Sequence, residues 1–126
     1  LLEEYIWLIC FDTTMQCVGI FEISHGSCNQ SILHIPQVLQ RTLLSGASVI
    51  VLGHNHPSGI VTPSNEDIQM TRRLWIASNI LDITLLDHII VSGANKKEYC
   101  SLREIKAEIF EIREGNNRIK EIEEGF

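Results

Sequence analysis

The sequence predicts an α/β fold in which helices flank a mixed β-sheet. Short runs of β-branched and aromatic residues alternate with two longer segments whose apolar residues recur at helical spacing. The resulting order is two strands, a helix, a strand, a helix and two strands, which implies a mixed sheet with helices packed on it. The chain has 126 residues, of which 44% are hydrophobic, enough for one domain with its own core.

The first two predicted strands, residues 5–10 and 16–24, form an antiparallel hairpin around a turn at 12–14. If Phe11 pairs with Gln16, alternate residues share one face of the hairpin. That face carries Tyr5, Trp7, Ile9, Val18, Ile20 and Glu22. We expect it to face the core. A carboxylate there is costly unless it is paired or lies in a cleft, so Glu22 is a candidate for chemistry. The alternative is a solvated glutamate near the strand end.

The remaining elements follow from apolar periodicity and from helix start and stop signals. Pro36 suits the first turn of a helix at 36–46, and Gly46 suits its end. The apolar run 48–53 predicts a buried strand, a second helix begins at Ser64, and strands follow at 83–91 and 97–102. The domain is expected to span 1–103. Residues 104–126 form a charged extension, for which a short amphipathic helix and a solvated or partner-docked segment both stay open.

Charge and cysteine content restrict the partners and the compartment. The formal net charge is −6 and the basic residues are scattered, so the domain alone is a poor candidate for tight DNA binding. No apolar run reaches the length that spans a bilayer, and no basic secretory leader is visible. Four cysteines without a C-x-x-C pair predict reduced thiols in a cytoplasmic protein. The hairpin would place Cys10 opposite Cys17, so a bridge there is the lesser alternative.

Two histidines directly follow the predicted strand 48–53, in the run His54-Asn55-His56-Pro57. In extended backbone, residues i and i+2 point to the same side, so both imidazoles can reach one metal ion. Pro57 and the Ser58-Gly59 pair then turn the chain away. Taken alone, this pattern is weak evidence for a metal site, and two polar loop residues are the better explanation.

A carboxylate at the start of the next helix completes a candidate zinc site. Ser64-x-x-Asp67 follows Pro63, and this spacing is also that of a capping box variant. The two roles are compatible, because a helix start that faces a strand end presents Asp67 across the cleft. Two histidines and one carboxylate leave a fourth position for water, as in catalytic zinc sites. Glu22 would then take a proton from that water.

Together these residues resemble the JAMM motif of the JAB/MPN+ metalloproteases. The runs HNHPSG at 54–59, PSNED at 63–67 and LLDHIIVSG at 85–93 are most similar to the bacterial RadC-like branch, over residues 5 to 103. The resemblance implies a cytidine-deaminase-like α/β sandwich that hydrolyses amide or isopeptide bonds. By it, His54, His56 and Asp67 bind Zn²⁺, Glu22 activates the water, and Ser64 stabilises the oxyanion.

The sequence also bears on other functions. The RadC-like resemblance also allows a non-catalytic or accessory module in DNA repair or replication-linked processes. A nucleotide deaminase needs H-x-E and P-C-x-x-C, and the sequence has neither. His88 is either a core histidine or a support for a metal ligand, and we do not expect it to be a ligand. A protein or peptide is the expected substrate, and a homodimer stays open.

Overall fold

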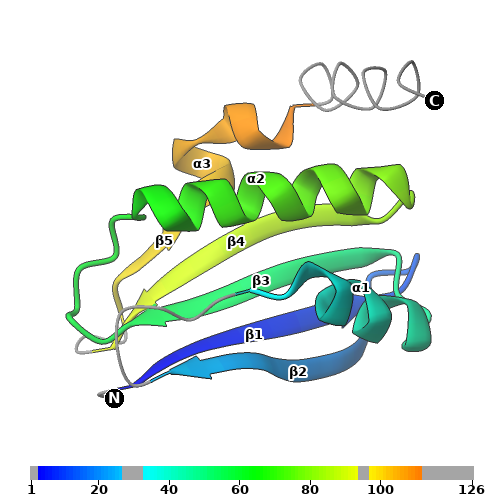
Figure 1. The fold of residues 1–126 in the computed structure, drawn as a ribbon, viewed down its shortest axis with the longest axis horizontal. Coiled ribbons are helices and arrows are strands. Elements are labelled where there is room, and N and C mark those ends of the chain that lie inside the picture. Colours follow the sequence, from blue (N-terminus) through cyan, green and yellow to red (C-terminus); the bar gives the residue numbers. More distant parts are fainter. Residues whose placement is uncertain (1–2, 27–32, 94–96, 112–126) are drawn as a thin grey trace.

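The computed structural model describes residues 3–26, 33–93 and 97–111 and contains a five-stranded sheet. Its order is β2-β1-β3-β4-β5, in which β3 and β4 are parallel and the other neighbours are antiparallel (Figure 1). The strands are β1 (Glu4–Phe11), β2 (Cys17–Gly26), β3 (Val49–His56), β4 (Thr84–Ser92) and β5 (Tyr99–Ser101). The predicted mixed sheet of an α/β fold is therefore confirmed.

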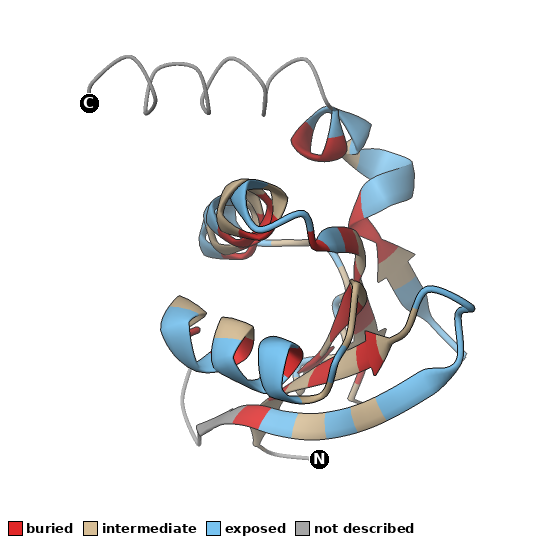
Figure 2. Cartoon of the chain, turned by 90° about the vertical axis from the view of Figure 1, so that its right-hand side faces the viewer, coloured by how far each residue is buried: buried red, intermediate tan, exposed pale blue. Residues whose placement is uncertain are grey.

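Both long helices, α1 (Ile35–Leu44) and α2 (Asn65–Ile80), pack against the same face of the sheet (Figure 2). α1 contacts β2, and α2 contacts β4. The core lies between these layers, because the apolar side chains of the covered face are removed from water there. Its fully buried members include Ile6 and Leu8 of β1, Ile50 and Leu52 of β3, Val38 of α1 and Leu74 of α2.

The face of the β1–β2 hairpin that packs against the helices is the opposite of the one we predicted. Ile6, Leu8 and Cys10 are 0% exposed, whereas Ile20 on the expected core face is 65% exposed. The expected register is also wrong. Phe11 pairs with Cys17, and irregularities in the ladder then shift the pairing, so that Trp7 lies beside Glu22. We call the uncovered side, which carries Trp7 and Glu22, the outer face of the sheet.

The cysteines that the structure describes are free thiols. Cys10 pairs with Gly19 rather than with Cys17, because of the same change of register. Cys10 is buried in the core, and Cys17 is exposed. Cys28 lies outside the described residues. The alternative of a bridge between Cys10 and Cys17 is therefore not realised.

The packed part of the chain continues past residue 103, where we expected the charged extension to begin. A short helix α3 (Leu102–Ile105) and a 3-10 turn η1 (Ala107–Phe110) follow β5 directly. Ile109 and Phe110 are buried and belong to the core cluster. Residues 112–126 of the predicted extension lie outside the described residues. Among the helices in the described ranges, none has the length and apolar character needed to cross a bilayer.

Candidate metal centre

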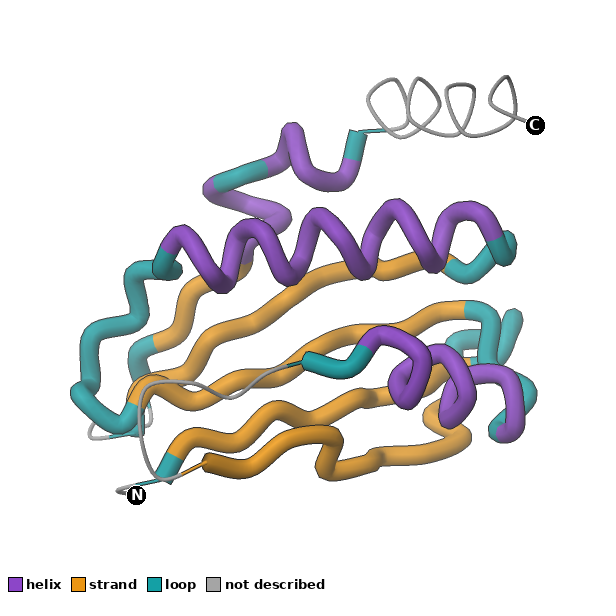
Figure 3. The backbone as a smooth tube through the Cα atoms, viewed as in Figure 1, coloured by secondary structure: helices purple, strands orange, loops and turns teal. Residues whose placement is uncertain are grey.

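The sequence-predicted metal ligands meet at one end of the sheet. β3 and β4 both end there, α2 begins there, and β1 starts there in the opposite direction (Figure 1). The connection from β3 to α2 passes around this end as a loop (Figure 3). Because strand ends and a helix start meet here, side chains from three elements converge without any long excursion of the chain.

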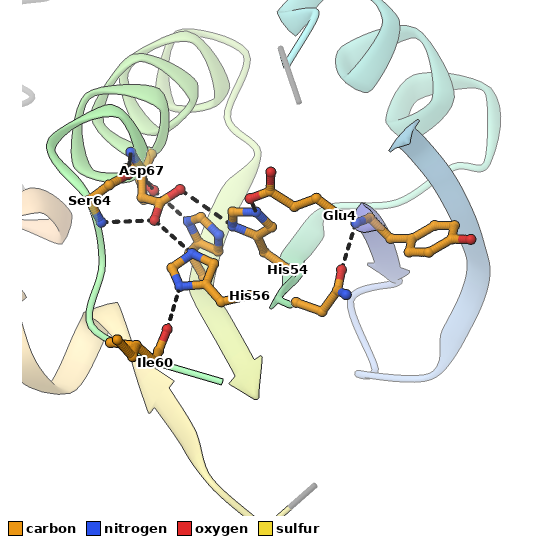
Figure 4. Close-up of polar contacts among 10 residues, drawn as sticks. Glu4, His54, His56, Ile60, Ser64 and Asp67 are labelled. Carbon is orange, nitrogen blue, oxygen red and sulfur yellow. Dashed lines mark hydrogen bonds and ion pairs between the residues drawn. The ribbon is translucent and has the colours of Figure 1, made fainter. Parts of the chain in front are cut away.

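His56 is the outermost residue of β3 and points toward the start of α2. Its Nδ1–H donates to the backbone carbonyl of Ile60, 2.7 Å away, in the loop that follows (Figure 4). Its Nε2 lies 3.0 Å from Oδ2 of Asp67. A backbone carbonyl that accepts from one ring nitrogen fixes the orientation of the ring and leaves the other nitrogen to bind a cation.

His54 lies one pleat further into the sheet, paired with Ile6 of β1, and is only 2% exposed. Its Nε2 is 2.5 Å from Oε1 of Glu4, and its Nδ1 faces Oδ1 of Asp67 at 3.4 Å (Figure 4). Within the described residues this Nδ1 has no hydrogen-bond partner, although it is buried. Since Nε2–H donates to Glu4, the lone pair of Nδ1 points at a carboxylate oxygen.

Asp67 combines a structural role with a place in the site. Ser64 is the N-cap of α2: its Oγ accepts from the Asp67 N–H at 3.0 Å, and its N–H donates to Oδ2 of Asp67 at 2.9 Å. The predicted capping box is thus confirmed. Asp67 is 5% exposed. Burial would raise its pKa, but the hydrogen bonds from His56 and Ser64 and the two imidazoles together lower the pKa to about 2.

The donor set fits a divalent cation. Ligand atoms about 2.0–2.1 Å from a tetrahedral zinc lie roughly 3.3 Å apart. Asp67 presents a different oxygen to each histidine, at 3.4 and 3.0 Å. Three potential ligand atoms, one each from Glu4, His54 and His56, also lie within 4.8 Å of one another. Two neutral imidazole lone pairs facing one carboxylate need a positive charge between them, either a proton or a metal ion.

Glu4 is the residue that our sequence reasoning missed. It is half-buried, and it shares the covered side of β1 with Ile6. The alternation of side chains along β1 could have identified it, because Glu4 is two residues before Ile6 and Ile6 pairs with His54. That argument requires knowing that β1 lies beside β3, which the sequence does not show.

The structure does not bring Glu22 to this cluster, contrary to our prediction. Glu22 is exposed and pairs with Trp7, so it lies on the outer face of the sheet. The prediction failed because it took the outer face of the hairpin for the core face. The acidic side chain beside His54 is that of Glu4, from the first residue of β1.

His88 lies behind His54 and holds the start of α2 to β4. It is 0% exposed, and its ring lies 5.7 Å from the His54 ring, centroid to centroid, with an interplanar angle of 27°. Thr71 Oγ1 donates to the Asp67 carbonyl at 2.6 Å and lies 2.6 Å from His88 Nδ1. Burial, with a smaller contribution from His54, lowers the His88 pKa to about 3, so this imidazole is neutral.

Comparison with known proteins shows the family to which this chain belongs. A model of the RadC-like JAB domain matches residues 1–108. The chain belongs to this family. It is 41% identical over 102 residues to a UPF0758 protein of Clostridium acetobutylicum, a match that covers 81% of this chain and 43% of that protein.

Two further relatives match with similar identity and similar coverage of each chain. A UPF0758 protein of Geotalea uraniireducens is 44% identical over 93 residues, which cover 74% of this chain and 41% of the relative. One of Thermotoga maritima is 38% identical over 102 residues, 81% of this chain and 45% of the relative. The chain therefore spans less than half the length of these curated relatives. The RadC-like resemblance seen in the sequence is confirmed.

Proposed function

We propose that this domain is a zinc-dependent hydrolase that cleaves peptide or isopeptide bonds. His54, His56 and Asp67 would hold the ion, and a bound Zn²⁺ lowers the pKa of its water toward neutrality. The observation that carries the proposal is the arrangement of Asp67, whose two oxygens each face an imidazole nitrogen that is free to bind a cation. Membership of the RadC-like JAB family supports a metallohydrolase role.

Glu4 replaces Glu22 as the proposed general base. Its Oε1 lies beside His54, and one ligand atom each from Glu4, His54 and His56 come within 4.8 Å of one another. A base must come within hydrogen-bond distance of the proton that it removes. Glu4 would take that proton from the attacking water and later deliver it to the leaving amine. Glu22 is on the other side of the sheet and cannot make this transfer.

Ser64 is proposed to donate its hydroxyl hydrogen to the developing oxyanion of the substrate. Its Oγ accepts from the Asp67 N–H, which fixes the oxygen while leaving its own hydrogen available. The residue is exposed at the start of α2, next to the candidate ligands. A donor fixed in advance stabilises negative charge with little reorganisation.

The experiment combines metal analysis with hydrolysis of a peptide library by the protein loaded with Zn²⁺. We expect one equivalent of tightly bound zinc and measurable cleavage. His54→Ala should lose the metal, whereas Glu4→Gln should keep the metal and retain only a small residual rate of cleavage. Glu22→Gln is the matched control, because it makes the same change on the same hairpin and should cleave normally. Absence of stoichiometric zinc, or full activity of Glu4→Gln, would refute the proposal.

A further inference from the structure

Asn55, between the two histidines, makes contacts that the proposed hydrolysis does not itself require. It is 2% exposed, although its side chain carries two polar atoms. Its Oδ1 accepts from the backbone N–H of Tyr5 at 2.6 Å, and its Nδ2 donates to the backbone carbonyl of Glu3 at 2.8 Å. Both partners lie at the start of the neighbouring strand: Tyr5 is the second residue of β1, and Glu3 directly precedes β1.

These two hydrogen bonds continue the pairing of β1 with β3 beyond its last backbone pair. The ladder runs from Phe11 opposite Val49 to Ile6 opposite His54. A carboxamide carries one acceptor and a donor group, as a peptide unit does, so it can bind an N–H and a C=O together. The Asn55 side chain thus replaces the backbone of β3 as the partner of β1.

The two backbone groups that Asn55 binds are the ones on either side of Glu4. The carbonyl of Glu3 belongs to the peptide unit before the Glu4 Cα atom, and the N–H of Tyr5 belongs to the unit after it. Holding both units fixes the backbone of Glu4 and hence the direction of its Cβ. Its carboxylate then reaches Nε2 of His54 at 2.5 Å.

We propose that Asn55 is a positioning residue that acts through Glu4. The inference rests on the proposed function, because it assigns Asn55 to the placement of the proposed general base. Alternate residues of a strand point to opposite sides, so one three-residue stretch serves both purposes. His54 and His56 face the ion, while Asn55 anchors the strand that carries the base. A displacement of about 1 Å in such a site lowers a rate on the order of 100-fold.

The first test follows histidine imidazole nitrogens by NMR in the metal-free protein, so it needs no substrate. In Asn55→Leu, which has a similar shape and neither hydrogen bond, the His54 Nε2 signal should shift as it does in Glu4→Gln. Asn55→Leu combined with Glu4→Gln should match Glu4→Gln alone, because coupled residues are not additive. An unchanged His54 signal in folded Asn55→Leu would overturn the proposal.

Hydrolysis gives the second readout. Asn55→Leu should keep one zinc and lose on the order of 100-fold in kcat, with no further loss in the Glu4→Gln background. Thr42→Val is the matched control: it removes a buried hydrogen bond within α1, between Thr42 Oγ1 and the Val38 carbonyl, and should leave kcat unchanged. If Asn55→Leu lowers kcat by the same factor in the unaltered protein and in Glu4→Gln, then Asn55 has a general structural role and the proposal is overturned.

A third measurement uses the unaltered protein and stays decisive if Asn55→Leu fails to fold. The Tyr5 amide lies beyond the last backbone pair of β1 and β3, yet it should exchange slowly with deuterium because Asn55 binds it. Rapid exchange would overturn the proposal. If the NMR and exchange results hold while no peptide is cleaved, the proposed hydrolase function fails and the contact of Asn55 with Glu4 stands.

Discussion

The Nε2 atom of His56 and the Oδ2 atom of Asp67 lie 3.0 Å apart, while the other nitrogen of the same imidazole binds the carbonyl of Ile60. Because Nδ1 carries the hydrogen given to Ile60, only a proton or a metal ion on Nε2 makes the contact with Asp67 favourable. The hydrogen bond to Asp67 accordingly raises the His56 pKa in the metal-free protein. Protons and metal ions therefore compete for one position.

The stability of the metal-free protein should depend on this pair. The raised His56 pKa adds stability that is fully present below the unfolded value near 6.5 and is lost as pH rises through the folded pKa. The lowered pKa of Asp67, about 2, adds about 2 kcal/mol that is lost as pH falls below 3.8. The lowered His88 pKa destabilises the folded state as pH falls below 6.5, because only the unfolded chain then takes up the proton. We expect maximal stability near pH 6.5.

Urea unfolding in the presence of a chelator measures this profile. The informative quantity is the difference in unfolding free energy between the unaltered protein and His56→Gln. It should be largest below about pH 6.5 and should shrink as pH rises, since the unaltered protein alone loses the bound proton. A difference that stays constant from about pH 5.5 to 8.5 would contradict the assignment.

Ser64 and Asp67 share a capping box but should respond differently to substitution. Ser64→Ala removes the acceptor of the Asp67 N–H and should cost about 1 kcal/mol of stability while zinc stays bound. If its hydroxyl also serves the oxyanion, kcat should fall by about 100-fold or more. Asp67→Asn should weaken zinc binding by at least about 100-fold, more than an outer contact would. Chemical unfolding measures the loss of stability, and calorimetric titration measures the zinc affinity. Equal zinc affinity in Ser64→Ala and Asp67→Asn would refute the assignment of Asp67 as a ligand.

The sequence could reveal the metal-ligand part of the site because each feature there is local. His54 and His56 are two residues apart in one strand, and Ser64 with Asp67 forms a helix cap. The general base was not readable in this way. All residues of β1 from 5 to 11 are apolar or aromatic, so alternation does not show which face the helices cover. Only the packing of α1 and α2 decides that Glu4, and not Glu22, faces the histidines.

Thr71 should be required for its hydroxyl, not for its shape. Thr71→Val keeps the volume but removes the contacts to His88 Nδ1 and to the Asp67 carbonyl. Leaving those buried groups unpaired should cost about 1–3 kcal/mol, and freeing the His88 ring behind His54 should weaken zinc binding by about 10-fold or more. Thr71→Ser restores the hydroxyl and should recover zinc affinity. Thermal unfolding and zinc titration test this, and equal affinity in Val and Ser variants would count against it.

Gly93 should be the glycine least tolerant of alanine near the metal centre. A Cβ atom at Gly93 would lie 2.8 Å from the Cα of Pro57 and 3.0 Å from the carbonyl oxygen of His56, and both are backbone atoms that cannot rotate away. Its N–H also donates to that carbonyl at 2.9 Å, so the chain after β4 and the turn after β3 are in direct contact.

Gly93→Ala should therefore push the turn at Pro57 outward and move His56 with it. Overpacking of this kind costs about 1–3 kcal/mol, and displacing a ligand should weaken zinc binding by about 10-fold or more. Gly53→Ala is the matched control, because the nearest atom to a Cβ there is Cε3 of Trp7 at 3.8 Å, an ordinary contact. Zinc titration and urea unfolding of both variants decide the point. If Gly93→Ala binds zinc as tightly as Gly53→Ala, then the position of His56 does not depend on the contact with β4, and β3 alone fixes it.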